Sequence, residues 1–301
     1  MFNYIIVMEK SSKKVRVFYG KFFLPWNPVV HLTDQNKVQK VIVFDLDETL
    51  GSFGDLYILW AGILHIYPEY SKFNSLLDLY PEFIRYGVYA ILLFLHNKKK
   101  TGECSKVYIY TNNQCPNKWV SHLLQYFQYK LNIELFDNVI GAFKIKNKRI
   151  EISRTSHSKS YQDFIRCTLL PPSTEICFID DTEYEKMKND KIYYICPRSY
   201  IHSLSVREII KRITCLWTGD ELNLLKSVDY WENWFLIHGR NDSEYVYMDM
   251  QNANLKISQK MMFHVKEFFI LSTRPGLFQT RRKNQRVRKT RKKKGPIFRS
   301  R

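Results

Sequence analysis

Continuous apolar runs alternate with amphipathic segments between residues 41 and 213. Runs rich in β-branched and aromatic residues cover 41–47, 106–113, 138–145, 175–182 and 191–196. Such runs predict strands that are buried on both faces. Segments with a helical spacing of apolar residues cover 82–97, 117–131, 158–170 and 203–213. This alternation predicts right-handed β-α-β crossovers, and therefore an α/β fold with a central parallel sheet.

Four further stretches are apolar or aromatic. Residues 56–67 and 86–96 are shorter than the roughly twenty residues that span a bilayer, so they predict core helices and no membrane partner. The aromatic residues in 229–239 could stack nucleobases, but we interpret them as core. Residues 257–273 predict an amphipathic helix. We expect residues 214–280 to form an extension that packs on the main domain, because about seventy residues make a marginal independent fold.

Polar side chains follow three of the predicted strands at the point where each strand ends. Asp45 and Asp47 follow the first strand, Thr111 and Asn112 the second, and Asp180 and Asp181 the third. The carboxyl ends of parallel strands lie along the same edge of a sheet, where ligands bind. We therefore expect these three pairs to converge, whereas alternation along the strand should point Glu48 away from them.

This combination of residues suits phosphoryl transfer. A carboxylate at Asp45 could attack phosphorus and form an aspartyl-phosphate that water hydrolyses. Asp47 could protonate the leaving oxygen and later take a proton from that water. Because these anions repel a phosphate dianion, the chemistry needs a divalent cation, and Mg²⁺ prefers such oxygen ligands. Asp180 and Asp181 are the remaining ligands, and the Thr111 hydroxyl could bind a phosphoryl oxygen.

Four motifs follow one another along the chain: DLDETL at 45–50, YTNN at 110–113, a lysine at 159 and FIDDT at 178–182. They resemble the motifs of the haloacid dehalogenase superfamily of phosphatases, which have a Rossmann-like fold. DLDETL is typical of the branch that resembles the RNA polymerase II carboxy-terminal-domain phosphatases, also called NLI-interacting-factor-like phosphatases. That branch usually has Arg-Pro-Gly where this chain has Tyr80-Pro81-Glu82. The resemblance covers about residues 38–213, and large DNA viruses encode divergent members of this kind.

The resemblance implies a role for each acidic residue. Asp45 would be the nucleophile and a metal ligand. Asp47 would be the general acid and base, and its backbone carbonyl would also bind the Mg²⁺. Asp181 would contact the metal directly, while Asp180 would orient a metal-bound water.

The resemblance also implies the residues around the phosphoryl group. Thr111 and Asn112 would contact it, and the hydroxyl of Thr49 would support the loop beside it. Lys159 would be the cation that neutralises charge on the transferred group. Three nearby residues are alternatives for that cation or for a phosphate contact: Lys146, Lys148 and His157.

The intervals between the motifs leave no room for a large cap. An uncapped site favours a macromolecular phosphoester, such as phosphoserine or phosphothreonine in a phosphoprotein. A nucleic-acid phosphate end is the alternative substrate. A third hypothesis is a nucleic-acid-binding or scaffold protein that keeps the fold without catalysis. The predicted organisation is an N-terminal extension at 1–37, a phosphatase domain at 38–213, the extension at 214–280 and a basic tail at 281–301.

The basic tail dominates the charge of the chain. Residues 281–301 contain twelve Lys or Arg and no acidic residue, which is two thirds of the formal net charge of +18. Blocks of like charge repel, and they commonly bind nucleic acid or another polyanion. A solubilising tail without a single partner is the alternative.

The six cysteines include no C-x-x-C pair and no spacing typical of zinc sites. We interpret them as reduced thiols, with Cys115 as structural rather than nucleophilic. The first twenty residues lack the order of a signal peptide. These features predict an intracellular protein of the nucleus or cytoplasm, in the host cell if the chain is viral.

Overall fold

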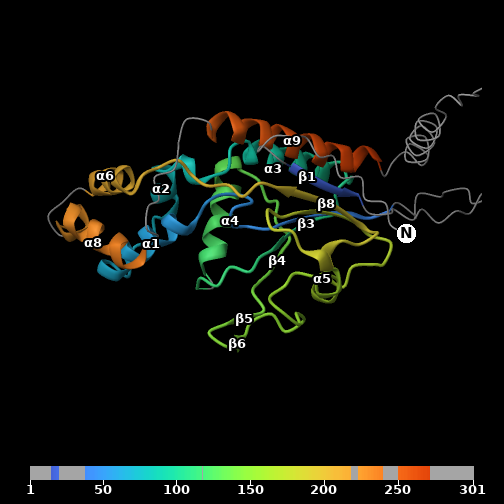
Figure 1. Cartoon of the computed structure of the whole chain (residues 1–301), viewed down its shortest axis with the longest axis horizontal. Helices are drawn as coiled ribbons and strands as arrows, with labels where there is room; N and C mark the ends of the chain where they lie inside the picture. Colours follow the sequence, from blue (N-terminus) through green and yellow to red (C-terminus); the bar gives the residue numbers. More distant parts are fainter. Residues whose placement is uncertain (1–14, 20–37, 117, 218–222, 240–249, 272–301) are drawn as a thin grey trace, which may run out of the picture.

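The computed structural model describes residues 15–19, 38–116, 118–217, 223–239 and 250–271. Within these residues the centre is a six-stranded sheet in the order β1-β8-β7-β2-β3-β4 (Figure 1). Its strands are β1 Val15–Tyr19, β2 Lys40–Phe44, β3 Lys106–Tyr110, β4 Asn138–Ile140, β7 Glu175–Ile179 and β8 Ile192–Pro197. All neighbouring pairs are parallel except β1 and β8, which are antiparallel. The predicted α/β fold with a mostly parallel sheet is confirmed.

Helices cover both faces of the sheet. They are α1 Gly54–Ile66, α2 Phe73–Asp78, α3 Val88–Lys100, α4 Lys118–Leu131, α5 Tyr161–Thr168, α6 Val206–Leu216, α7 Asn223–Lys226, α8 Val228–His238 and α9 Met250–Leu271. Short 3₁₀ turns lie at Pro81–Phe83 and Glu185–Met187. Figure 1 shows α3 and α9 on one side of the sheet and α5 on the other. No helix of the described residues is long and apolar enough to cross a membrane.

The alternation of side chains along β2 divides the core into two layers. Ile42 and Phe44 belong to the larger layer, together with apolar residues of α1, α3, α4, α6 and α9. Val41 and Val43 belong to the smaller layer, where Phe164 of α5 covers the sheet. Because both faces are buried, β2 and β7 are apolar without polar alternation after their first residues, Lys40 and Glu175.

A group of helices lies beside the sheet and includes the predicted aromatic segment 229–239. Figure 1 shows α1, α2, α6 and α8 gathered there, and α8 contacts both α1 and α6. Trp231 is fully buried, and Trp234 donates its ring N–H to the carbonyl of Ile58 at 3.0 Å. The interpretation of this segment as core is therefore confirmed for its inward face, while Leu236 and Ile237 are exposed.

Three elements differ from the sequence prediction. The helix predicted from residue 82 begins at Val88, because Gly87 has a left-handed backbone with φ of 78° and residue 84 bridges to Gly51 instead. The predicted strand 138–145 is divided into β4 and a hairpin of β5 Lys144–Ile145 and β6 Lys148–Arg149. No element was predicted within the N-terminal extension, and β1 of this segment extends the sheet beside β8. The basic tail at 281–301 lies outside the described residues.

Candidate functional site

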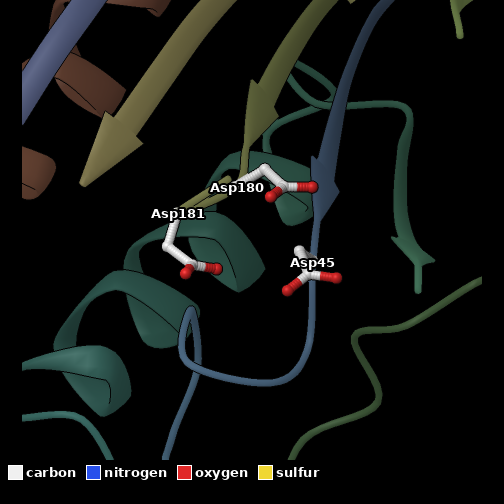
Figure 2. A group of neighbouring side chains, drawn as sticks. All are labelled: Asp45, Asp180 and Asp181. Atoms are coloured by element: carbon white, nitrogen blue, oxygen red, sulfur yellow. The ribbon is translucent and has the colours of Figure 1, made fainter. Parts of the chain in front are cut away.

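The three predicted polar pairs follow neighbouring strands of the sheet. β7, β2 and β3 lie side by side and parallel, so their carboxyl ends share one edge. Asp45, Asp180 and Asp181 each offer a carboxylate oxygen, and these oxygens all lie within 4.8 Å of one another. Figure 2 shows the three carboxylates around a common space between the loops after β2 and β7. Oxygen donors of this kind suit a hard divalent cation, so the cluster could hold a metal ion.

The ammonium group of Lys159 lies in this cluster. It donates to Oδ2 of Asp180 at 2.7 Å and to Oδ1 of Asp45, and its side chain is only 1% exposed. Burial alone would lower the pKa of Lys159, but the two carboxylates outweigh it and hold the pKa above its usual value. Lys146 and Lys148, the alternatives in the sequence, are exposed on the hairpin. The cation beside Asp45 is therefore Lys159.

The segment around Lys159 is held rigidly. Ser160 caps α5 by accepting a hydrogen bond from the backbone N–H of Asp163 at 3.1 Å. The buried carboxylate of Asp163 accepts hydrogen bonds from the backbone and hydroxyl of Thr155. The rings of Tyr110, Phe178 and Tyr184 lie 5.5–6.0 Å from the ammonium of Lys159. These contacts fix the direction of the lysine side chain before any ligand binds.

The buried carboxylates carry more negative charge than Lys159 can neutralise. Burial raises the pKa of Asp180 to about 7, although Lys159 and the backbone N–H of Thr182 both stabilise its ionised form. Burial also raises the pKa of Asp45. With Asp181 included, three carboxylates face the ammonium of Lys159 and the guanidinium of Arg85, which also attracts Asp181, so the acidic groups still outnumber the cations and a proton or a further cation would balance the site. This imbalance is the physical reason that the cluster fits a divalent ion.

Asp47 lies beside the cluster rather than in it. Its carboxylate is not one of the three clustered groups, and its Oδ2 accepts a hydrogen bond from the side chain of Asn113 at 2.9 Å. Burial raises the pKa of Asp47 to about 6, which suits a group that both gives and takes protons near neutral pH. The expected metal contact through its backbone carbonyl stays a prediction. Asn113 was missed by the sequence reasoning, which stopped at Asn112.

Thr49 holds Asp181 rather than facing the open edge of the site. The Thr49 hydroxyl donates to Oδ1 of Asp181 at 3.0 Å and accepts from the Asp181 backbone N–H at 3.0 Å. Ser199 donates to the other carboxylate oxygen of Asp181 at 2.6 Å. Thr49 is fully buried, so its hydroxyl supports the loop and the Asp181 carboxylate. A direct phosphate contact by Thr49 is not favoured, because that hydroxyl is already paired in both directions.

Thr111 and Asn112 follow β3 on the other side of Asp45. The Thr111 hydroxyl accepts from the backbone N–H of Asn113 at 2.9 Å, and the side chain of Asn112 donates to the Tyr184 hydroxyl at 3.2 Å. Both residues thus lie in an ordered turn at the same edge of the sheet as Asp45. Their contact with a phosphoryl group stays a prediction.

Two buried arginines that the sequence reasoning missed hold the loops of the site. Arg85 donates to the carbonyls of Thr49 at 2.6 Å, Glu48 at 2.5 Å and Arg198 at 2.8 Å. It thereby joins the loop after β2 to the loop after β8. Burial lowers the pKa of Arg85 to about 10, so its guanidinium remains charged near neutral pH. The signal that could have found Arg85 is its spacing from Gly87, just before an apolar helical segment.

Arg154 plays the corresponding part on the opposite side. It donates to the backbone carbonyl of Thr111 at 3.1 Å, to Gly141 at 2.7 Å, to Oδ1 of Asn112 at 2.7 Å and to His157 at 3.0 Å. The Arg154 side chain is fully buried and packs on the ring of Tyr110. The turn after β3 and the segment that leads to Lys159 are therefore joined through a single guanidinium.

The thiol of Cys115 does not have the properties of a nucleophile. Burial raises its pKa to about 11, so the reactive thiolate is disfavoured. The six cysteines of the chain are all free thiols in the structure, as expected.

No family model matches the chain, and no curated protein matches its sequence significantly.

Proposed function

We propose that the protein is a Mg²⁺-dependent phosphatase that hydrolyses phosphomonoesters through an aspartyl-phosphate on Asp45. It would belong to the haloacid dehalogenase superfamily, in the branch that resembles the carboxy-terminal-domain phosphatases. The observation that carries this proposal is the position of Lys159 between Asp45 and Asp180, with Asp181 completing the carboxylate cluster. Residues 45, 159 and 180 are far apart in sequence, and a solvated acidic loop has no need of a buried ammonium.

The residues of the site have distinct parts in this reaction. A carboxylate oxygen of Asp45 attacks phosphorus, and the bond between phosphorus and the ester oxygen breaks. Asp47 gives its proton to the leaving oxygen. Water then attacks the phosphorus of the aspartyl-phosphate and Asp47 takes the proton back, which releases inorganic phosphate and restores Asp45. Lys159 offsets negative charge on the transferred group and holds Asp45 in place.

Mg²⁺ would be held by the carboxylates of Asp45 and Asp181, with Asp180 close by and the backbone carbonyl of Asp47 as a further ligand. When bound, it would neutralise the phosphoryl oxygens so that an anionic nucleophile can approach them. The Asp181 carboxylate is held in place by the chain itself rather than by the metal ion, because Thr49 and Ser199 both donate hydrogen bonds to it.

The Arg-Pro-Gly triplet of this branch supports the resemblance further when it is aligned with residues 85–87. Residues Arg85 and Gly87 supply its arginine and glycine, with Tyr86 in place of the proline. Arg85 binds the loop that follows Asp47, and Gly87 starts α3 with a left-handed backbone that glycine adopts without strain. We therefore assign the triplet to residues 85–87 instead of Tyr80-Pro81-Glu82.

Phosphoserine or phosphothreonine in a protein is the substrate that we favour. The interval between Asp47 and Thr111 forms α1, α2 and α3, which lie in the core with their apolar sides, so none of it is a separate cap domain over the site. A site without such a cap favours a substrate that is itself a macromolecule. A nucleic-acid phosphate end is the alternative, favoured by the basic residues 281–301. Deletion of those residues should reduce the salt dependence of polyanion binding.

Hydrolysis of an aryl phosphate tests the proposal. Wild-type protein should release phosphate with Mg²⁺ present and lose this activity when a chelator removes the metal. Asp45→Asn should abolish turnover while the thermal transition persists, because the substitution keeps the size of the side chain. Turnover that survives Asp45→Asn would exclude Asp45 as the nucleophile. Absence of activity in wild type on aryl, peptide and nucleotide phosphoesters would favour the binding or scaffold hypothesis.

A further inference from the structure

The β5–β6 hairpin carries a concentration of positive charge beside the site. Its cations are Lys144, Lys146, Lys148 and Arg149, and Glu151 is the only acidic residue between positions 138 and 160. Lys146, Lys148 and Arg149 are exposed. Figure 1 shows the hairpin projecting from the sheet on the same side as α5.

The geometry of the hairpin is unfavourable for its own stability. Lys144 lies directly opposite Arg149 in the antiparallel register, and like charges in opposed positions destabilise a strand pair. The turn residues Lys146 and Asn147 have positive φ angles of 46° and 63°, a left-handed conformation that suits Asn but disfavours Lys. An anionic partner would relieve this repulsion. Without such a partner, the repulsion only lowers the stability of the hairpin.

Direct contacts join the hairpin to the rim of the site. Arg154 holds the carbonyl of Gly141, at the base of the hairpin, together with the side chain of Asn112. Arg149 donates to the carbonyl of Arg154 at 2.7 Å. The ring of Phe143 packs edge-on against His157, two residues before Lys159. The base of the hairpin is therefore joined to the turn after β3 and to the segment that leads to Lys159, which both border the site.

The aromatic side chain of the hairpin favours a peptide over single-stranded nucleic acid. Nucleobases bind by stacking on aromatic faces. The Phe143 ring already has Lys144 at 5.0 Å, Arg149 at 5.4 Å and the His157 ring at 5.5 Å from its centroid. By contrast, Ile152 is 77% exposed beside the cations, so the surface offers charge and an apolar side chain but no open stacking platform.

We propose that the β5–β6 hairpin binds acidic residues that flank the phosphorylated residue of a peptide substrate. This inference rests on the proposed phosphatase function and specifies the substrate class: phosphoserine or phosphothreonine within an acidic sequence. The lysines attract the flanking carboxylates, and they raise the local concentration of substrate at the edge of the sheet where Asp45 lies.

The test compares two phosphoserine peptides on full-length protein. One has Asp and Glu on both sides of the phosphoserine, and the other has Asn and Gln in their place. Wild type should hydrolyse the acidic peptide with a kcat/KM about tenfold higher at low salt, and the preference should shrink at high salt because exposed charges are screened. The variant Lys144→Gln, Lys146→Gln, Lys148→Gln should lose most of the preference. Arg149 is left intact because it binds backbone carbonyls.

A matched variant controls for net charge. Lys100→Gln, Lys211→Gln and Lys256→Gln remove the same three charges from exposed positions on α3, α6 and α9. This variant should keep the preference, and both variants keep the basic residues 281–301. Equal loss of preference in the two variants would overturn the proposal, because the effect would then be that of overall charge. No preference in wild type would overturn it as well.

Separate readouts distinguish failure of the inference from failure of the proposed function. Aryl phosphate hydrolysis reports on the phosphatase site, and the hairpin variant should keep it unchanged. Binding of the two labelled peptides to Asp45→Asn by fluorescence anisotropy reports on the hairpin without turnover. A 5′-phosphorylated single-stranded oligonucleotide is the third probe. Hairpin-dependent binding of this oligonucleotide that is tighter than binding of the acidic peptide would overturn the proposal in favour of nucleic acid.

Discussion

Thr49 and Asp181 exchange two hydrogen bonds across the edge of the sheet. The Thr49 hydroxyl donates to Oδ1 of Asp181 and accepts from its backbone N–H, both at 3.0 Å. The bonds connect the loop after β2 to the loop after β7, which are the two loops that supply the clustered carboxylates. Thr49, together with Ser199 on the other carboxylate oxygen, therefore fixes the position from which Asp181 can bind a metal ion.

We predict that Thr49→Val weakens metal binding more than it weakens the fold. Valine keeps the shape of the side chain but leaves the Asp181 N–H without its acceptor, which costs about 1–3 kcal/mol. The Mg²⁺ concentration that gives half-maximal aryl phosphate hydrolysis should rise several-fold. Thr49→Ser keeps the hydroxyl and serves as the control. Equal Mg²⁺ dependence in the two variants would show that the Thr49 hydroxyl does not position Asp181.

Lys159→Met should cost both activity and stability. Removal of one partner from a buried ion pair leaves uncompensated charge and costs about 3–5 kcal/mol. Loss of a group that stabilises the transition state typically reduces kcat by about a hundredfold or more. Lys146→Met is the matched control, because Lys146 is exposed on the hairpin. Thermal unfolding and aryl phosphate turnover of both variants check the prediction, and a Lys159→Met protein with wild-type kcat would remove Lys159 from the mechanism.

The sequence predicted the parts of the site that depend on strand ends. Continuous apolar runs identified β2, β3 and β7, and the parallel arrangement then required the residues after them to meet at one edge. Lys159 was harder, because Lys146 and Lys148 are equally basic. Lys159 is the side chain that enters the cluster, because Ser160 caps α5 next to it and the rings of Tyr110 and Phe178 lie around its ammonium group.

The missed features depend on tertiary contacts that leave no periodic signal. Arg85 lies within a segment predicted to be helical, yet its guanidinium enters the core to bind three backbone carbonyls. Strand β1 precedes the first motif and pairs with β8, about 180 residues later in the chain. Asn113 differs from Asn112 in the sequence only by its position in a turn, and the turn decides which of them reaches Asp47. Local patterns cannot specify such long-range pairs.

Metal removal should have a pH-dependent effect on stability. Burial raises the pKa of Asp180 from 3.8 to about 7 and that of Asp47 to about 6. The folded, metal-free protein therefore binds protons that the unfolded chain has released, and this contribution to stability is lost as the pH rises from about 4 to about 7. Mg²⁺ competes with these protons, so its stabilising effect should grow over the same pH range.

The measurement is the thermal shift caused by saturating Mg²⁺ between pH 5 and pH 8. At a hundred times its dissociation constant a ligand stabilises a protein by about 2.7 kcal/mol, which corresponds to a shift of several degrees. Asp180→Asn with Asp181→Asn should abolish the shift at every pH. A shift of equal size at pH 5 and pH 8, or one that persists in the double variant, would contradict a Mg²⁺ site at these carboxylates.

Arg85 should control the site through the two loops that it joins. Its bonds to Glu48, Thr49 and Arg198 hold the loop that carries Asp47 against the loop that carries Ser199, the partner of Asp181. Arg85→Met keeps most of the side-chain volume but removes every one of these bonds, so we expect a loss of about 2–5 kcal/mol in the free energy of unfolding.

The functional consequence of Arg85→Met separates positioning from general stability. At a temperature where the variant is folded, its kcat on aryl phosphate should fall at least tenfold and its Mg²⁺ requirement should rise, because both loops have lost their common support. Arg85→Lys restores the charge but not the planar group that reaches three carbonyls, so it should recover only part of the activity. Arg207→Met on the exposed surface of α6 is the control and should behave as wild type. Wild-type kcat and Mg²⁺ dependence in folded Arg85→Met would limit Arg85 to a structural part.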